Sequence, residues 1–283
     1  MEVKTYFDQE TATFTHLVWD SRSKQAVIID PVLNFNYRSG KTGTSATDSV
    51  IDDIKQLGLK LQYILETHAH ADHLSSAPYI KAQCGGQTGI GTKVPLVQDA
   101  FKGVFNMADL ATDGSQFDLL LGEGDSLELG ELNIKVLETP GHTPACVSYH
   151  IGDALFIGDT FFTPHYGTAR ADFPGGDANA LYQSLQRILS FPDATKLYLC
   201  HDYPAVGEAP QHLSTVAEQR HNIHLQGSGA EDFIKLRKAR DAGLDMPVLI
   251  LPAIQVNIRA GELPAPENNA VAYLKIPLNQ IVK

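Results

Sequence analysis

The sequence of 283 residues is long enough for one large domain or for two smaller ones. Its hydrophobic fraction of 43% and charged fraction of 19% are typical of a globular protein, and no apolar run is long enough to cross a membrane. The formal net charge of −11 argues against nucleic-acid binding, which needs clustered Lys and Arg to neutralise phosphates. We therefore expect neither a nucleic-acid nor a membrane partner.

The N-terminal residues 1–8 carry neither the apolar core of a secretory signal nor an Arg-rich transit pattern, so we expect a cytoplasmic protein. The three cysteines, Cys84, Cys146 and Cys200, lack Cys-x-x-Cys spacing, which predicts reduced thiols rather than disulfides or a thiolate zinc site. Strand alternation further predicts that Cys200 points away from its neighbour His201 and is not a metal ligand.

The first part of the chain predicts alternating strands and helices. Apolar runs indicate strands over 13–19, 26–29 and 61–65, and helical spacing of apolar residues indicates helices over 48–57 and 74–82. A Gly/Ser/Thr-rich loop is expected over 39–47.

The remainder predicts a second group of strands with its own helices. A helix and loop are expected over 95–117 and antiparallel strands over 127–157. These are followed by a helix over 179–189, a strand over 196–200, helices near 214–225 and 230–242, and a Pro-rich tail from 247. Two strand groups, each with helices, predict an α+β fold in which two mixed sheets pack face to face with helices outside, an αββα sandwich.

The densest cluster of possible metal ligands follows the apolar run 61–65, where six residues contain His68, His70, Asp72 and His73. Side chains at the end of a strand can converge on one point, and imidazoles with carboxylates suit zinc, iron or manganese. Three further strand ends carry such a residue: His142 after 132–137, Asp159 after 154–157 and His201 after 197–199. The repetition predicts a metal centre at one edge of the sandwich.

The motifs His-x-His-x-Asp-His, Gly-His-Thr and Gly-Asp-Thr, followed by a late histidine, resemble those of the metallo-β-lactamase superfamily. The resemblance covers about residues 13–203 and implies the αββα fold. It also implies two metal positions that share Asp159. The first would use His68, His70, His142 and Asp159, and the second Asp72, His73, Asp159 and His201.

A narrower resemblance, to the persulfide dioxygenases and their bacterial β-lactamase-hydrolase-like branch, comes from the segments 67–73, 167–173, 200–203 and 251–260. This resemblance implies one Fe(II) per chain, held by His68, His142 and Asp159. The remaining positions, His70, Asp72, His73 and His201, would then surround the iron or form a second metal position that is usually empty. Two histidines and one carboxylate leave coordination positions open for substrate and O₂.

The implied reaction oxidises glutathione persulfide with O₂ to sulfite and glutathione. Tyr203 and Asp72 are the expected catalytic residues beside the metal. Arg170 is expected to contact the carboxylates of glutathione, although an ordinary surface salt bridge remains an alternative. Tyr203 is also expected to face the substrate, with a packed tyrosine as its alternative. Asn257 and Arg259, in the tail segment, are further expected substrate contacts.

Two other functions stay open. A dinuclear Zn(2+) thiolester hydrolase similar to glyoxalase II would use every ligand position, although its His-Glu-Tyr phrase is replaced here by His201-Asp202-Tyr203. A non-catalytic metal-binding protein is the other possibility, but no ligand is missing. We expect a single metallo-β-lactamase-like domain over 1–283, with the helices and tail of 204–283 packed on it. A homodimer and a separate rhodanese-type sulfurtransferase are possible partners.

Overall fold

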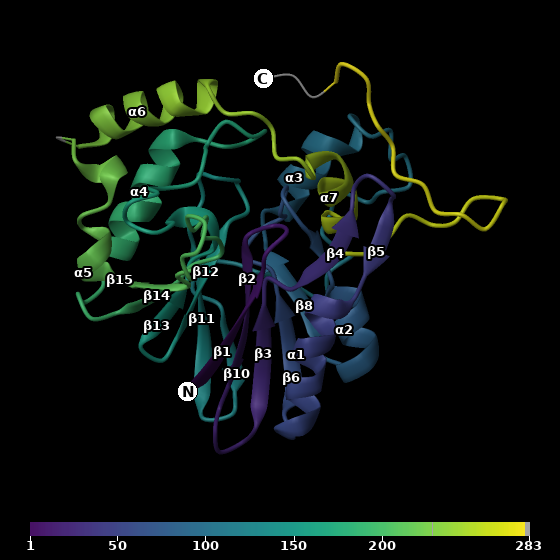
Figure 1. Ribbon diagram of the computed structural model, residues 1–283, viewed down its shortest axis with the longest axis horizontal. Helices are drawn as coiled ribbons and strands as arrows, with labels where there is room; N and C mark the ends of the chain where they lie inside the picture. Colours follow the sequence, from purple (N-terminus) through teal and green to yellow (C-terminus); the bar gives the residue numbers. More distant parts are fainter. Residues whose placement is uncertain (228, 281–283) are drawn as a thin grey trace.

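The computed structural model describes residues 1–227 and 229–280, and its centre is a pair of six-stranded sheets (Figure 1). The first sheet has the order β1 (Glu2–Asp8), β2 (Thr13–Trp19), β3 (Gln25–Ile29), β6 (Lys60–Leu65), β8 (Gln87–Gly91) and β9 (Leu119–Leu121). The second has the order β10 (Ser126–Leu129), β11 (Leu132–Glu138), β12 (Val147–Ile151), β13 (Ala154–Phe156), β14 (Lys196–Tyr198) and β15 (Leu213–Thr215). A small sheet joins β5 (Lys41–Gly43), β4 (Val32–Asn36) and β7 (Leu74–Ser75).

Both large sheets are mixed, as expected. In the first, β3, β6, β8 and β9 run parallel, whereas β1 and β2 are antiparallel. In the second, β13 and β14 are parallel neighbours, and the other described neighbouring pairs are antiparallel. The facing sides bury one apolar cluster, to which the first sheet contributes Val27 and Leu65 and the second contributes Val136, Tyr149 and Phe156. Burial of these side chains stabilises the sheet pair.

Helices cover the two outer faces. On the first sheet, Ile51 of α1 (Ser45–Gln56) and Ile80 of α2 (Ala77–Cys84) share a buried cluster with Ile64. On the second, Leu185 of α4 (Ala178–Leu189) packs in a cluster with Leu197, and Phe233 of α6 (Ala230–Ala242) joins it. The remaining helical segments are α3 (Val94–Lys102), α5 (Val216–Gln219), α7 (Ile250–Asn257) and the 3₁₀ turns η1 (Gly158–Thr160) and η2 (Ile223–Leu225). The αββα sandwich is confirmed.

Some local predictions were wrong. The helix expected near 214–225 is instead the edge strand β15, the single-turn helix α5 and η2, because β15 pairs with β14. The loop expected over 39–47 contains β5, which pairs with β4, and the N-terminal β1 was not anticipated. Each of these short strands is defined by pairing with a neighbouring strand, which its own residue pattern does not indicate.

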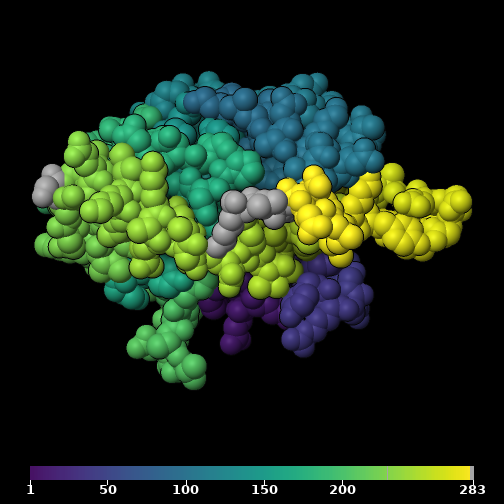
Figure 2. Space-filling view, turned by 90° about the horizontal axis from the view of Figure 1, so that it is seen from above, coloured from purple at the N-terminus to yellow at the C-terminus, as the bar shows by residue number. Residues whose placement is uncertain are grey.

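The C-terminal region packs on the sandwich only in part. α7 buries Ile250, Ile254 and Val256, so the beginning of the expected tail is helical and covered. Most of residues 262–280 are exposed, and Figure 2 shows this yellow segment projecting from the body. Beyond Gly261, Leu274 packs against the buried cluster of Leu74 and Ala253, and Lys275 is bonded to Gln255 of α7. No helix in the described parts of the chain is long and apolar enough to span a bilayer.

Candidate metal centre

Three side chains from three strand ends meet at one edge of the sandwich. The ligand atoms of His68, His142 and Asp159 all lie within 4.8 Å of one another. Asp159 Oδ2 is 3.9 Å from His68 Nε2 and 3.6 Å from His142 Nε2. All three residues are buried. The predicted iron ligands are therefore brought together.

The motif glycines allow the turns that carry two of these ligands. Gly141 has φ +136, and a Cβ there would lie 2.3 Å from the backbone nitrogen of Leu181. Gly158 has φ +51, and a Cβ would lie 2.7 Å from Thr67 Oγ1. Only glycine fits such a backbone at this distance, so Gly-His-Thr and Gly-Asp-Thr are as much packing motifs as ligand motifs.

The imidazoles are oriented by bonds on their far side. His142 Nδ1 donates to the carbonyl oxygen of Arg170 at 2.8 Å, and His68 Nδ1 lies 3.0 Å from Thr67 Oγ1. Both rings therefore present Nε2 to the centre. Burial, together with the neighbouring imidazoles, holds the pKa of His68 well below its usual value. His68 is thus kept in the neutral form that binds metals.

A second group of ligand atoms adjoins the first. His70, Asp72 and His73 have their ligand atoms within 4.8 Å of one another. His201 Nε2 lies 3.1 Å from Asp72 Oδ2 and 3.3 Å from Asp159 Oδ1, so Asp159 borders both groups. The other nitrogen of His201, Nδ1, is 3.1 Å from the carbonyl oxygen of Ala12.

Unpaired buried atoms indicate that a metal ion fits here. Among the described residues, four atoms of the ligand set are buried without a hydrogen-bond partner: His70 Nδ1, His73 Nε2, Asp159 Oδ1 and His201 Nε2. Buried polar atoms of this kind are costly unless a partner satisfies them. Imidazole nitrogens and a carboxylate oxygen are the donors that divalent transition metals prefer. The donor set therefore fits a divalent metal.

Sequence reasoning missed two carboxylates behind His70. Asp30 Oδ1 accepts from His70 Nε2 at 3.0 Å, and Glu66 Oε2 lies 3.3 Å from the same nitrogen. Burial disfavours a charged imidazole, but Asp30 and Glu66 outweigh it and raise the pKa of His70 well above its usual value. Asp30 also accepts from the backbone nitrogen and hydroxyl of Thr67, at 2.7 and 2.9 Å. A carboxylate at the end of β3 was the only sequence signal.

The prediction for Cys200 was wrong in its geometry. β14 ends at Tyr198, so strand alternation does not apply, and the Cys200 sulfur lies within 4.8 Å of ligand atoms of His70 and His201. Burial and the nearby Asp30 raise the pKa of the thiol well above its usual value. The thiol lies 3.6 Å from Asp30 Oδ2 and donates to it, which favours a protonated thiol over a thiolate ligand.

An open cleft of about 670 Å³ leads to this centre and is lined by Asp72, His142 and Asp159 at its base. Arg170 lies in its wall, held by Asp172 at 2.6 Å and by the carbonyl oxygen of Asp245 at 2.6 Å. The guanidinium also lies 4.8 Å from the centre of the Phe173 ring. Arg170 is therefore fixed at the cleft rather than free on the surface.

Tyr203 also lines the cleft, with its ring stacked on Tyr166 at 4.7 Å between centroids. Burial and the carboxylates of Asp72 and Asp159 raise the pKa of its phenol, which therefore stays protonated and able to donate. The residue as a whole is 42% exposed, so a bound molecule can reach it.

Asn257 and Arg259 do not line the cleft, which corrects their expected role in substrate contact. Arg259 pairs with Asp109 at 3.1 Å, away from the metal ligands. Asn257 is buried beneath residues 66–75, which we call the metal loop. All hydrogen bonds found for its side chain go to backbone atoms of that loop. The sequence of the segment 251–260 could not show that Asn257 lies beneath the metal loop rather than in the cleft.

The family model for the metallo-β-lactamase superfamily matches residues 9–201, which include every ligand described above. The chain belongs to the metallo-β-lactamase superfamily. Within it, a probable metallo-hydrolase of Burkholderia pseudomallei is 51% identical over 99% of this chain and 100% of its own length. A Dictyostelium discoideum protein named glyoxylase B2 is 46% identical over 99% of this chain and 98% of its own length.

Superfamily members named for persulfide oxidation are also similar. The mitochondrial persulfide dioxygenase ETHE1 of Mus musculus is 31% identical over 92% of this chain and 88% of its own length. The crystal structure of ETHE1 from Myxococcus xanthus superposes with a TM-score of 0.75 at 30% identity, covering 93% of this chain and 100% of that one. The chain spans 64% of a β-lactamase hydrolase-like protein of Agrobacterium fabrum, at 50% identity. The predicted superfamily and persulfide dioxygenase family are both supported.

Proposed function

We propose that this superfamily member is a non-haem iron dioxygenase that oxidises glutathione persulfide with O₂ to sulfite and glutathione. The observation that carries the proposal is the convergence of His68, His142 and Asp159 at the base of an open cleft. Two imidazoles and one carboxylate are the donor set of oxygenases that use Fe(II) and leave positions open for substrate and O₂. A bound iron would supply the electrons that triplet O₂ requires.

The proposed reaction balances without a further reductant. The terminal sulfur of the persulfide anion gains two oxygen atoms from O₂ and one from water, the S–S bond breaks, and the thiol leaves protonated. Sulfite and a proton are the other products. Because the sulfur is oxidised and O₂ is reduced, the overall reaction needs only a persulfide, oxygen and water.

Two cleft residues have roles that follow from their contacts. Arg170 uses part of its guanidinium to hold Asp172 and the carbonyl of Asp245, which leaves two N–H groups for a substrate carboxylate. Tyr203, with its protonated phenol, can donate to a developing oxyanion on the sulfur. Asp72 borders the same cleft, within reach of His201.

The similarity to two proteins named ETHE1 over more than nine-tenths of this chain supports the proposal. A second candidate, a dinuclear zinc hydrolase of a glutathione thiolester, is favoured by the complete second ligand group of His70, Asp72, His73 and His201. The relatives named metallo-hydrolase and glyoxylase B2 agree with that candidate. Zinc held by these residues would supply a hydroxide nucleophile near neutral pH for hydrolysis of the thiolester.

The test pairs metal analysis of anaerobically purified protein with oxygen uptake. We expect about one iron per chain and O₂ consumption that depends on glutathione persulfide. Both should be lost in His142→Ala and kept in His221→Ala, a matched control at an exposed histidine outside the centre. About two zinc ions per chain, no oxygen uptake and turnover of lactoylglutathione would overturn the dioxygenase and establish the hydrolase.

A further inference from the structure

The metal loop is bonded to a helix that lies far from it in sequence. Asn257, the last residue of α7, donates from Nδ2 to the carbonyl oxygens of His70 and His73 at 2.8 and 2.7 Å. Its Oδ1 accepts from the backbone nitrogen of Ser75 at 2.8 Å. The side-chain amide of Asn257 is therefore bonded to the main chain of the metal loop on both sides of Asp72.

These bonds join a network that reaches a ligand ring. Ser75 Oγ donates to Glu66 Oε1 at 2.5 Å, and the other oxygen of Glu66 lies 3.3 Å from His70 Nε2. By fixing the backbone of Ser75, Asn257 also fixes a side chain that holds Glu66 against the imidazole. Outer contacts of this kind orient metal ligands and affect metal affinity.

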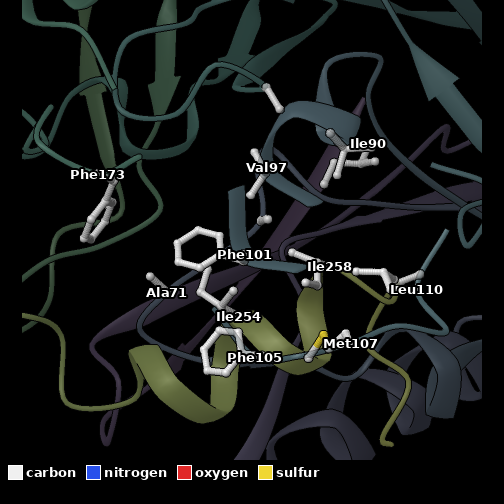
Figure 3. Close-up of a cluster of buried hydrophobic side chains, with 14 of the residues drawn as sticks. Ala71, Ile90, Val97, Phe101, Phe105, Met107, Leu110, Phe173, Ile254 and Ile258 are labelled. Carbon is white, nitrogen blue, oxygen red and sulfur yellow. The ribbon is translucent and has the colours of Figure 1, made fainter. Parts of the chain in front are cut away.

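Apolar contacts join α7 to the same loop. Ala71 belongs to the buried cluster of Ile254 and Ile258, and Figure 3 shows it beside Ile254 at the side of the helix. Leu74 belongs to a separate buried cluster with Ala253. The loop thus turns its alanine and leucine side chains to the helix while its histidines face the metal site.

We propose that Asn257 is a positioning residue of the metal centre, which presets His70, Asp72 and His73 for a metal ion before one binds. The family model ends at residue 201, so this helix lies outside the part of the chain that the superfamily model matches. An aspartate could not replace the amide, because a carboxylate cannot donate to the two carbonyl oxygens. The proposal does not depend on which reaction the bound metal serves.

The first test uses the unaltered protein without metal. Exchange of the Ser75 amide hydrogen, followed by NMR, should be slowed at least about 100-fold relative to an unstructured peptide, because the bond to Asn257 is present without metal. Exchange at the unstructured rate, with protection appearing only on metal addition, would mean that the metal orders the loop and would overturn the proposal. This measurement decides the matter even if a variant fails to fold.

The second test compares two substitutions on one helix. Asn257→Asp should weaken Co²⁺ binding to the metal-free protein by about ten- to 100-fold, measured from the visible absorption of the complex. Gln255→Ala is the control: Gln255 is equally buried and makes three bonds to the backbone, but to Leu251 and Lys275 rather than to the loop. Its Co²⁺ affinity should stay within about twofold. Equal losses in both variants, or none in Asn257→Asp, would sink the idea.

Discussion

His142 donates through Nδ1 to the carbonyl oxygen of Arg170 at 2.8 Å, so a metal ligand and a residue of the cleft wall are joined by one bond. Because the acceptor is a backbone atom, the bond survives substitution of the Arg170 side chain. The metal site and the proposed substrate contact of Arg170 can therefore be tested separately, although they are structurally adjacent.

Arg170→Lys should weaken substrate binding and leave the metal in place. Lysine cannot reproduce the planar contacts to Asp172 and the Asp245 carbonyl while presenting donors to a carboxylate. We expect KM for an anionic thiol substrate to rise about ten- to 100-fold, with kcat changed less than about threefold and metal content unchanged. Steady-state kinetics on Arg170→Lys and on the surface variant Arg220→Lys make the comparison. An unchanged KM would remove Arg170 from the binding site.

Asp30→Asn should lower metal affinity although it removes no metal ligand. The carboxylate accepts from His70 and from two groups of Thr67, and an amide can accept from only part of this set. We expect metal affinity to fall about ten- to 100-fold, measured by competition with a chelator. A variant with native affinity would show that Asp30 contributes to folding alone.

Gly141→Ala should be strongly destabilising. The new Cβ would meet the backbone of Leu181 at 2.3 Å, and the residue would also be held at φ +136. We expect a loss of about 3 kcal/mol or more in the free energy of unfolding, measured by denaturant titration. Gly40→Ala separates the two causes, since Gly40 has φ +67 but nothing within 4 Å of its Cβ. It should cost only about 1 kcal/mol.

His16 should make the protein less stable in mild acid. It is buried between Thr5 and the carbonyl of Leu199, and burial lowers its pKa to about 4. A lowered pKa means that its contribution is fully present above the unfolded value near 6.5 and is lost as the pH falls towards 4. The loss approaches about 3 kcal/mol over that interval.

The free energy of unfolding of metal-free protein should therefore be measured at pH 7.5, 6 and 5. It should fall more steeply with decreasing pH for the unaltered chain than for His16→Gln, because glutamine does not titrate. Parallel curves for the two proteins would contradict the assignment to His16. Using metal-free protein removes the separate effect of acid on metal binding.

The ligand motifs were predictable because each ends a strongly apolar strand, as with His68 after β6 and Asp159 after β13. The supporting residues were not. Asp30 is one carboxylate at the end of a strand, and Asn257 lies far along the chain from the loop that it holds. Their roles arise from tertiary contacts, which no local spacing encodes. The edge strand β15 was missed for the same reason, since its identity depends on pairing with β14.

The ring of His201 is held by the carbonyl oxygen of Ala12, and Phe14 of β2 donates from its backbone nitrogen to Cys200 at 2.7 Å. An ion held by His68 from the first half of the chain and by His142 and Asp159 from the second would therefore join the two halves beside these contacts. Because such an ion binds only the folded chain, it adds stability that grows with free metal, about 4 kcal/mol at 1,000 times its dissociation constant. In a cell short of the metal, the contact between the two halves would break more often and expose the chain to proteases. The abundance of the protein would then follow the supply of metal.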